Sequence, residues 1–223
     1  MPKRKLKTPA HQDFDKLLRS NIVPALALIL GKVLMLDIQQ TTPIPTTFPR
    51  TKEKRVDYAV KVRDTSGKEY IIHIEFQTKN DKRMHQRMLE YCETLYGHFG
   101  LDVIQFVLFI GSGKPSMITE ISLTNLQYRY HIIDLKTIDY HIFLDSQKPE
   151  EIMLAILCQF TRKEAQDVIT HIIERLFTAA DVADLPKYFI QLEILSKLRN
   201  LQRQTSQTIE KMPIHYDLKT DIR

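Results

Sequence analysis

The sequence predicts an α/β fold in which a mixed central sheet carries helices on its faces and a helical region follows at the C-terminal end. Three patterns support this class. Two segments rich in β-branched and aromatic residues, 55–62 and 70–77, flank a polar loop and are typical of a β-hairpin. An amphipathic helix and an unbroken apolar strand follow. From residue 149 onward, apolar residues recur with helical spacing.

Composition and charge narrow the class of protein. The 223 residues are 43% hydrophobic and 26% charged, which suits one globular domain with or without a helical extension. The formal charge is +5, and residues 1–10 form a basic arm suited either to neutralising phosphates or to solubilising the terminus. The sequence starts without an apolar signal region, its apolar run 25–36 is too short to span a bilayer, and Cys92 and Cys158 lack CxxC spacing. We therefore expect a cytoplasmic protein with reduced thiols and no membrane partner.

The segment before the hairpin predicts two helices and a connector. In residues 11–30, apolar side chains recur at three- and four-residue intervals, and Pro24 divides the pattern into two consecutive helices. Asp13 and Asp15 lie in the opening turn, where acidic side chains complement the helix dipole. Residues 39–52 hold three prolines among threonines, so we expect an extended loop there.

Each segment of the hairpin has one apolar face made of even-numbered residues: Val56, Tyr58, Val60 and Val62 in the first, and Tyr70, Ile72, Ile74 and Phe76 in the second. Its two apolar faces can share a core only if even residues pair with even ones. A three-residue loop ending at Gly67 meets this condition, because glycine supplies the left-handed position that such a loop requires. Asp57 then lies opposite Glu75, with Gln77 further along the same face, and directly opposed Cβ atoms are about 4.5–5.5 Å apart.

The paired carboxylates of the hairpin are the candidate metal site. Carboxylates at this separation repel one another unless a cation lies between them, and a divalent metal ion fits best. The alternative is a solvated face on which Arg55, Lys61 and His73 neutralise the acids. His73, like His131 and His141, lacks a convincing ligand spacing and is more typical of a structural or surface residue than of a zinc ligand.

A helix is predicted over residues 82–99, where Arg87 and Tyr91 are four residues apart and neighbour each other on its surface. Two interpretations stay open for this pair. In one, Tyr91 packs in the core while Arg87 pairs with Glu90 or Glu93. In the other, both side chains reach the acidic face of the hairpin, where the planar guanidinium suits a phosphate.

The rest of the chain predicts two further strands and then helices. Residues 102–110 form an unbroken apolar run, which is typical of a strand covered on both faces and completes a βαβ unit. Residues 126–135 alternate at first and predict an outer strand. Helices with amphipathic faces are expected over 147–201, where they wrap the core or pair with a second copy. Residues 202–223 are polar, and we expect a poorly packed tail.

The acidic hairpin and the helix after it resemble a known family. Five residues carry the resemblance: Asp57, Glu75, Gln77, Arg87 and Tyr91. Their pattern is similar to the Rpn family of recombination-promoting nucleases and transposases, which belongs to the PD-(D/E)XK nuclease superfamily. The similarity is good over residues 57–96 and extends more weakly from about residue 11 to about residue 176. It implies a PD-(D/E)XK restriction-endonuclease-like core over residues 11–146.

The resemblance implies a metal-dependent DNA endonuclease that hydrolyses phosphodiester bonds in transposition or recombination. Asp57 and Glu75 would hold Mg²⁺ or Mn²⁺. Gln77 stands in the superfamily's usual lysine position, as it does in the Rpn pattern, and would orient the attacking water. Arg87 and Tyr91 would contact the substrate phosphate.

Two residues keep alternatives open. Asp15, besides its role at the helix dipole, is a candidate accessory acid at the metal, because family members often begin with an acidic residue ahead of a Phe/Lys pair. Gln77 is neutral and cannot place a cation near the attacking water. The rival function is therefore a catalytically degenerate nuclease-fold module that binds DNA or a protein partner. A homodimer through the C-terminal helices is a further expectation.

Overall fold

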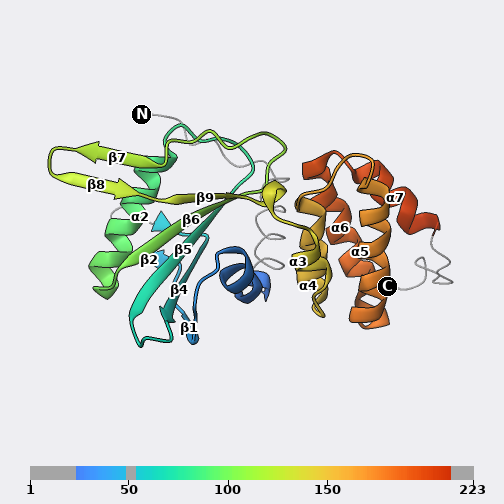
Figure 1. The fold of residues 1–223 in the computed structure, drawn as a ribbon, viewed down its shortest axis with the longest axis horizontal. Helices are drawn as coiled ribbons and strands as arrows, with labels where there is room; N and C mark the ends of the chain where they lie inside the picture. Colours follow the sequence, from blue (N-terminus) through green and yellow to red (C-terminus); the bar gives the residue numbers. More distant parts are fainter. Residues whose placement is uncertain (1–23, 49–53, 212–223) are drawn as a thin grey trace. The chain divides into compact units, whose positions relative to one another are not determined.

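The computed structural model describes residues 24–48 and 54–211 (Figure 1). The chain forms two units: Leu28–Thr137, which holds the sheet, and Met1–Ala27 together with Ile138–Arg223, whose described part is helical. The division after Thr137 comes earlier in the chain than the boundary expected after residue 146. The basic arm 1–10, the candidate acid Asp15 and residues 212–223 lie outside the described residues.

A five-stranded mixed sheet forms the centre of the unit Leu28–Thr137, in the order β1-β4-β5-β6-β9. Its strands are β1 (Gln40–Pro43), β4 (Tyr58–Arg63), β5 (Glu69–Gln77), β6 (Val103–Phe109) and β9 (His131–Asp134). Neighbours β1, β4 and β5 are antiparallel, whereas β6 runs parallel to β5 and β9 runs parallel to β6. The α/β class with a mixed central sheet is therefore confirmed.

The hairpin of β4 and β5 has the predicted register, in which even-numbered residues pair with each other: Tyr58 with Ile74, Val60 with Ile72, and Val62 with Tyr70. The Asp64 N–H donates to the Lys68 carbonyl at 3.0 Å and closes the three-residue loop between them. Gly67 occupies the left-handed region with φ of 85°, as the loop requires.

Two expected elements have different bounds. The connector predicted over residues 39–52 contains the edge strand β1. An edge strand tolerates Pro43 because the N–H groups on its outer side have no neighbouring strand to bond. The strand predicted over residues 55–62 is interrupted: β3 (Lys54–Arg55) pairs with β2 (Thr47–Phe48), Asp57 lies in a bend, and β4 begins after it.

The outer strand predicted over residues 126–135 is two strands. β8 (Leu126–Arg129) pairs with β7 (Glu120–Leu123) in a separate antiparallel ribbon, which extends past the main sheet in Figure 1. Only β9 joins the main sheet. Tyr130, which is 1% exposed, separates the two strands. The alternating segment therefore contributes β8 to the ribbon and β9 to the main sheet.

Helix α2 (Met84–Phe99) covers the face of the sheet that carries the odd-numbered residues of β4, β5 and β6 (Figure 1). Leu95 packs with Ala59 and Ile71, and the helix ends at Gly100, which has φ of 64°. The interpretation of this hairpin face as solvated is wrong, because His73 is fully buried and Glu75 is 4% exposed.

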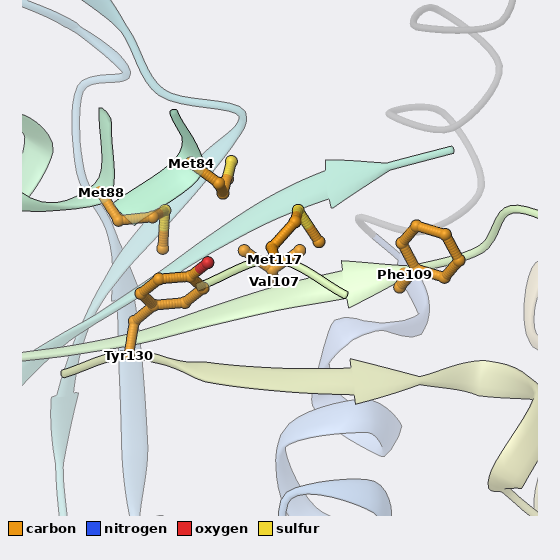
Figure 2. Packing of buried hydrophobic residues seen from close by; sticks show 6 residues of the cluster. All are labelled: Met84, Met88, Val107, Phe109, Met117 and Tyr130. Carbon is orange, nitrogen blue, oxygen red and sulfur yellow. The ribbon is translucent and has the colours of Figure 1, made fainter. Parts of the chain in front are cut away.

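Figure 2 shows the apolar cluster between α2 and β6. Its members are Met84, Met88, Val107, Phe109, Met117 and Tyr130. Residues of β6 on the opposite face, such as Leu108, are buried as well, which confirms the strand covered on both faces that the apolar run predicts.

The described helices of the second unit follow in sequence order: α3 (His141–Leu144), α4 (Pro149–Ile152), η3 (Met153–Leu157), α5 (Ala165–Ala179), η4 (Val182–Asp184), α6 (Leu185–Ser196), η5 (Lys197–Arg199) and α7 (Gln202–Lys211). The expectation of a poorly packed segment from residue 202 is wrong for α7. Thr205 in that helix is fully buried, and the Thr208 hydroxyl accepts a hydrogen bond of 2.8 Å from Gln166 of α5.

The helical segment near the start of the described residues agrees with the helix expected near Pro24. Residues 24–28 are helical and lead into the π-helix η1 (Ile29–Val33). Over the described ranges, no helix combines the length and the apolar character needed to cross a membrane.

Candidate functional site

The register of the hairpin brings Asp57 and Glu75 together. The last ladder pair, Tyr58 with Ile74, places the residue before β4 opposite the residue after Ile74. Each carboxylate accepts a hydrogen bond from the backbone beside the other: the Asp57 N–H donates to Glu75 Oε1 at 2.9 Å, and the Phe76 N–H donates to Asp57 Oδ2 at 3.1 Å. The predicted side-by-side arrangement is confirmed.

The two reciprocal bonds form where the chain bends at Asp57, just before β4. The Asp57 N–H donates to the Glu75 side chain and not to a backbone carbonyl of β5. The bend therefore directs one backbone donor to each acid. Bonds from backbone N–H groups fix the orientation of a carboxylate.

Arg87 supplies the positive charge beside the acids. Its Nη2 lies 3.4 Å from Glu75 Oε2, and its Nη1 donates to Asp81 Oδ2 at 3.1 Å. This geometry supports the interpretation that directs Arg87 toward the acidic hairpin. A guanidinium between the acids and Asp81 offsets the repulsion that the sequence leads us to expect from two neighbouring carboxylates.

The guanidinium of Arg87 is incompletely satisfied. Its Nε is buried and has no hydrogen-bond partner. Within the described part of the chain, only two other buried side-chain nitrogen or oxygen atoms lack a partner. The contact with Glu75 is long for a charge-assisted hydrogen bond. The side chain is nevertheless 34% exposed, so Arg87 retains donor capacity for an anion that approaches from solvent.

Tyr91 lies next to the acids on the following turn of α2. Its ring meets the His73 ring edge-on, with centroids 5.3 Å apart. Burial raises the pKa of the Tyr91 hydroxyl well above its ordinary value, and the neighbouring Glu75 carboxylate raises it further. The group is therefore a neutral phenol at physiological pH, and it reaches the same face as Arg87.

A buried polar chain leads from Glu75 into the core. His73 Nε2 lies 3.1 Å from Glu75 Oε1, and His73 Nδ1 lies 2.8 Å from Nε2 of Gln105 in β6. The Tyr128 hydroxyl bonds to Gln105 Oε1 at 2.5 Å. Burial raises the pKa of Tyr128, so its hydroxyl stays protonated and serves as the donor.

This polar chain was missed in the sequence, although one signal for it exists. Gln105 is a polar residue inside an otherwise apolar strand, and such a residue needs hydrogen-bonding partners in the core. The interpretation of His73 as a structural residue is consistent with its full burial. His131 and His141 are exposed and belong to β9 and α3.

Gln77 ends β5 on the same face as Glu75, since alternate residues of a strand share a face. Its backbone carbonyl accepts a hydrogen bond of 2.9 Å from the Ile110 N–H, and its side chain is half-buried. The structure therefore brings together Asp57, Glu75, Arg87 and Tyr91, with Gln77 two residues from Glu75.

The donor set fits a magnesium site of the kind completed by water and substrate. In the residues that the structure describes, no group of three or more His, Cys, Asp or Glu side chains is arranged to hold a metal ion. Asp57 and Glu75 are two hard oxygen ligands held side by side. Mg²⁺ is commonly bound through one or two carboxylates, with waters and phosphate oxygens in the remaining positions.

Comparisons with protein-family models, with curated proteins and with solved structures gave no match.

Proposed function

We propose that this chain is a metal-dependent DNA endonuclease of the Rpn type, associated with transposition or recombination. The observation that carries the proposal is the pairing of Asp57 and Glu75, each held by a backbone N–H beside the other, with the partly satisfied Arg87 next to them. The antiparallel strands β1, β4 and β5, joined through α2 to the parallel strand β6, support a PD-(D/E)XK-like core.

Asp57 and Glu75 would hold Mg²⁺ or Mn²⁺ with little rearrangement, because their backbone and side-chain donors already fix both carboxylates. When bound, such an ion lowers the pKa of a coordinated water and stabilises the negative charge that develops on the phosphate. Gln77 orients the attacking water through its side-chain amide, which donates and accepts hydrogen bonds.

Arg87 and Tyr91 bind the substrate phosphate in this proposal. The guanidinium turns its unpaired Nε and its Nη2 toward a phosphate and releases Glu75 to the metal. The Tyr91 phenol donates a hydrogen bond from the same helix face. Lys79, Lys82 and Arg83 are exposed in the segment between β5 and α2, where they attract the DNA backbone.

The test is nicking of supercoiled plasmid by purified protein with Mg²⁺ and with EDTA. The variant Asp57→Asn keeps an acceptor for the Phe76 N–H but removes the negative charge, so we expect it to abolish Mg²⁺-dependent nicking. The matched control is Asp102→Asn, which removes an exposed carboxylate that pairs with Lys68 beyond the opposite end of β5. Equal nicking by the wild type and Asp57→Asn would refute the proposal.

The second candidate function is a DNA-binding module without nuclease activity. One observation favours it: the superfamily lysine position carries the neutral Gln77. Such a module would retain the salt-dependent affinity for DNA while neither the wild type nor any variant cuts. We also propose a cytoplasmic location, because both cysteines of the chain are free thiols and suit a reducing compartment.

A further inference from the structure

The buried chain that ends at Glu75 has a defined direction. The Met88 carbonyl, which can only accept, lies 2.9 Å from Gln105 Nε2, so the amide nitrogen of Gln105 faces it and the amide oxygen faces the Tyr128 hydroxyl. Gln105 Nε2 also donates to His73 Nδ1. His73 must then carry its proton on Nε2 and donate it to Glu75 Oε1.

The consequence is an asymmetric carboxylate. Glu75 Oε1 accepts two hydrogen bonds, one from His73 and one from the Asp57 N–H. Glu75 Oε2 faces the long contact with Arg87. The side chain cannot rotate about its last bond without breaking both Oε1 bonds, so Oε2 remains directed toward Arg87.

We propose that Tyr128, Gln105 and His73 form a positioning relay that presents Glu75 Oε2 to the metal ion and the substrate phosphate. None of the three touches the substrate, and they act through the orientation of Glu75. The inference rests on the proposed metal-dependent function. It assigns a role to Gln105, a glutamine that is 2% exposed in the middle of β6.

The surroundings argue for a role beyond packing. Tyr128 packs against the apolar cluster whose buried members, among them Met84, Met88 and Val107, are drawn in Figure 2. Apolar side chains of similar shape would fill such a site without hydrogen-bonding requirements, whereas a buried amide and imidazole cost free energy unless every partner is present. Here each polar atom of Gln105 and His73 has its partner, and the chain ends on a candidate ligand.

A matched pair of tyrosines allows a test that separates positioning from stability. Tyr128→Phe removes the hydroxyl that donates to Gln105, and Tyr130→Phe removes a second hydroxyl in the same cluster that donates to the Ile118 carbonyl at 2.7 Å. Both changes delete one hydrogen bond and keep the ring. Of the two hydroxyls, only that of Tyr128 is connected to Glu75 through hydrogen bonds. The stronger variant is Gln105→Met, which has similar length and no hydrogen-bonding capacity.

The experiment titrates Mn²⁺, followed by electron paramagnetic resonance, into each full-length protein mixed with a cleavage-resistant phosphorothioate DNA duplex. We expect Gln105→Met to weaken Mn²⁺ binding about tenfold, the lower end of the effect of outer-shell partners on metal affinity. Tyr128→Phe should weaken it in the same direction. Tyr130→Phe should bind Mn²⁺ like the wild type, with a loss of thermal stability similar to that of Tyr128→Phe.

Three outcomes decide the matter. Wild-type Mn²⁺ affinity in both Gln105→Met and Tyr128→Phe would overturn the relay while leaving the proposed function intact. Equal weakening in Tyr130→Phe would also overturn it, because the effect would then follow general stability. Absence of Mn²⁺ binding by the wild type would overturn the proposed function and the relay with it.

Discussion

The turn after β6 offers a stability prediction with a magnitude, because Gly111 lies against the backbone at the end of β5. A Cβ atom added to Gly111 would meet the Thr78 carbonyl oxygen at 2.0 Å and the Thr78 carbonyl carbon at 2.7 Å. Ordinary contact begins near 3.4 Å, so Gly111→Ala requires the two backbones to separate by roughly 1.4 Å. The hydrogen bond from the Ile110 N–H to the Gln77 carbonyl lies next to this contact and would be strained or lost.

The expected cost combines overpacking, about 1–3 kcal/mol, with the loss of one backbone hydrogen bond, about 0.5–1.5 kcal/mol. We therefore expect Gly111→Ala to lower the free energy of unfolding by about 2–4 kcal/mol, and Tm by roughly 5–15 °C at about 2–4 °C per kcal/mol. Because Gln77 ends the displaced strand, nicking activity should fall as well.

The matched control is Gly113→Ala in the same turn, where an added Cβ meets nothing within 4 Å and the backbone is not left-handed. This change should alter the free energy of unfolding by no more than about 0.5 kcal/mol. Thermal and urea unfolding followed by circular dichroism provide the comparison. Equal midpoints for Gly111→Ala and Gly113→Ala would refute the close approach of Thr78 and Gly111.

Two further predictions concern the site and the two cysteines. Gln77→Lys should retain or raise plasmid nicking, because a cation near the attacking water stabilises charge in the transition state, whereas a module without catalytic activity would gain nothing from it. Burial raises the pKa of both the Cys92 and the Cys158 thiols, so little of either is thiolate near neutral pH. A thiol reagent should therefore label native protein slowly, at the half-buried Cys92 first and at Cys158 only on unfolding; rapid labelling of Cys158 would contradict its burial.

The hairpin could be predicted in detail because two constraints agreed. Each strand has an apolar face of even-numbered residues, which allowed only even-with-even pairing. A three-residue loop ending at the left-handed Gly67 gives the same register. Asp57 and Glu75 followed from this register without any knowledge of the tertiary structure. The helix α2 and the strand β6 were equally accessible, since their patterns extend over a dozen residues or form an unbroken apolar run.

The elements that sequence reasoning missed depend on partners distant in the chain. Strand β1 ends in a proline and all four of its residues are exposed, so its pairing with β4 is what makes it a strand. Helix α7 is polar, and it is ordered through hydroxyl and amide contacts such as Gln166 to Thr208. Local propensity carries no information about either contact.

The candidate site shows the same limit. The pairing of the acids is a local property of the hairpin, but the direction of Arg87 was undecided between surface acids and the hairpin because helical spacing permits both. The polar chain joins β5, β6 and β8, and no spacing rule connects His73 with Gln105 and Tyr128. Only the register of the parallel strands, which pairs His73 with Gln105, brings the first two together.

The central claim is that Asp57 and Glu75 bind a divalent metal ion together with DNA. Isothermal titration calorimetry of Mg²⁺ into the wild type mixed with a cleavage-resistant DNA duplex tests it directly, with Glu75→Gln in parallel. The amide keeps an oxygen acceptor for the Asp57 N–H but removes the negative charge that a hard cation requires. The account predicts a Mg²⁺ binding isotherm for the wild type that Glu75→Gln abolishes. Unchanged binding in Glu75→Gln, or no Mg²⁺ binding by the wild type in the presence of DNA, would contradict it.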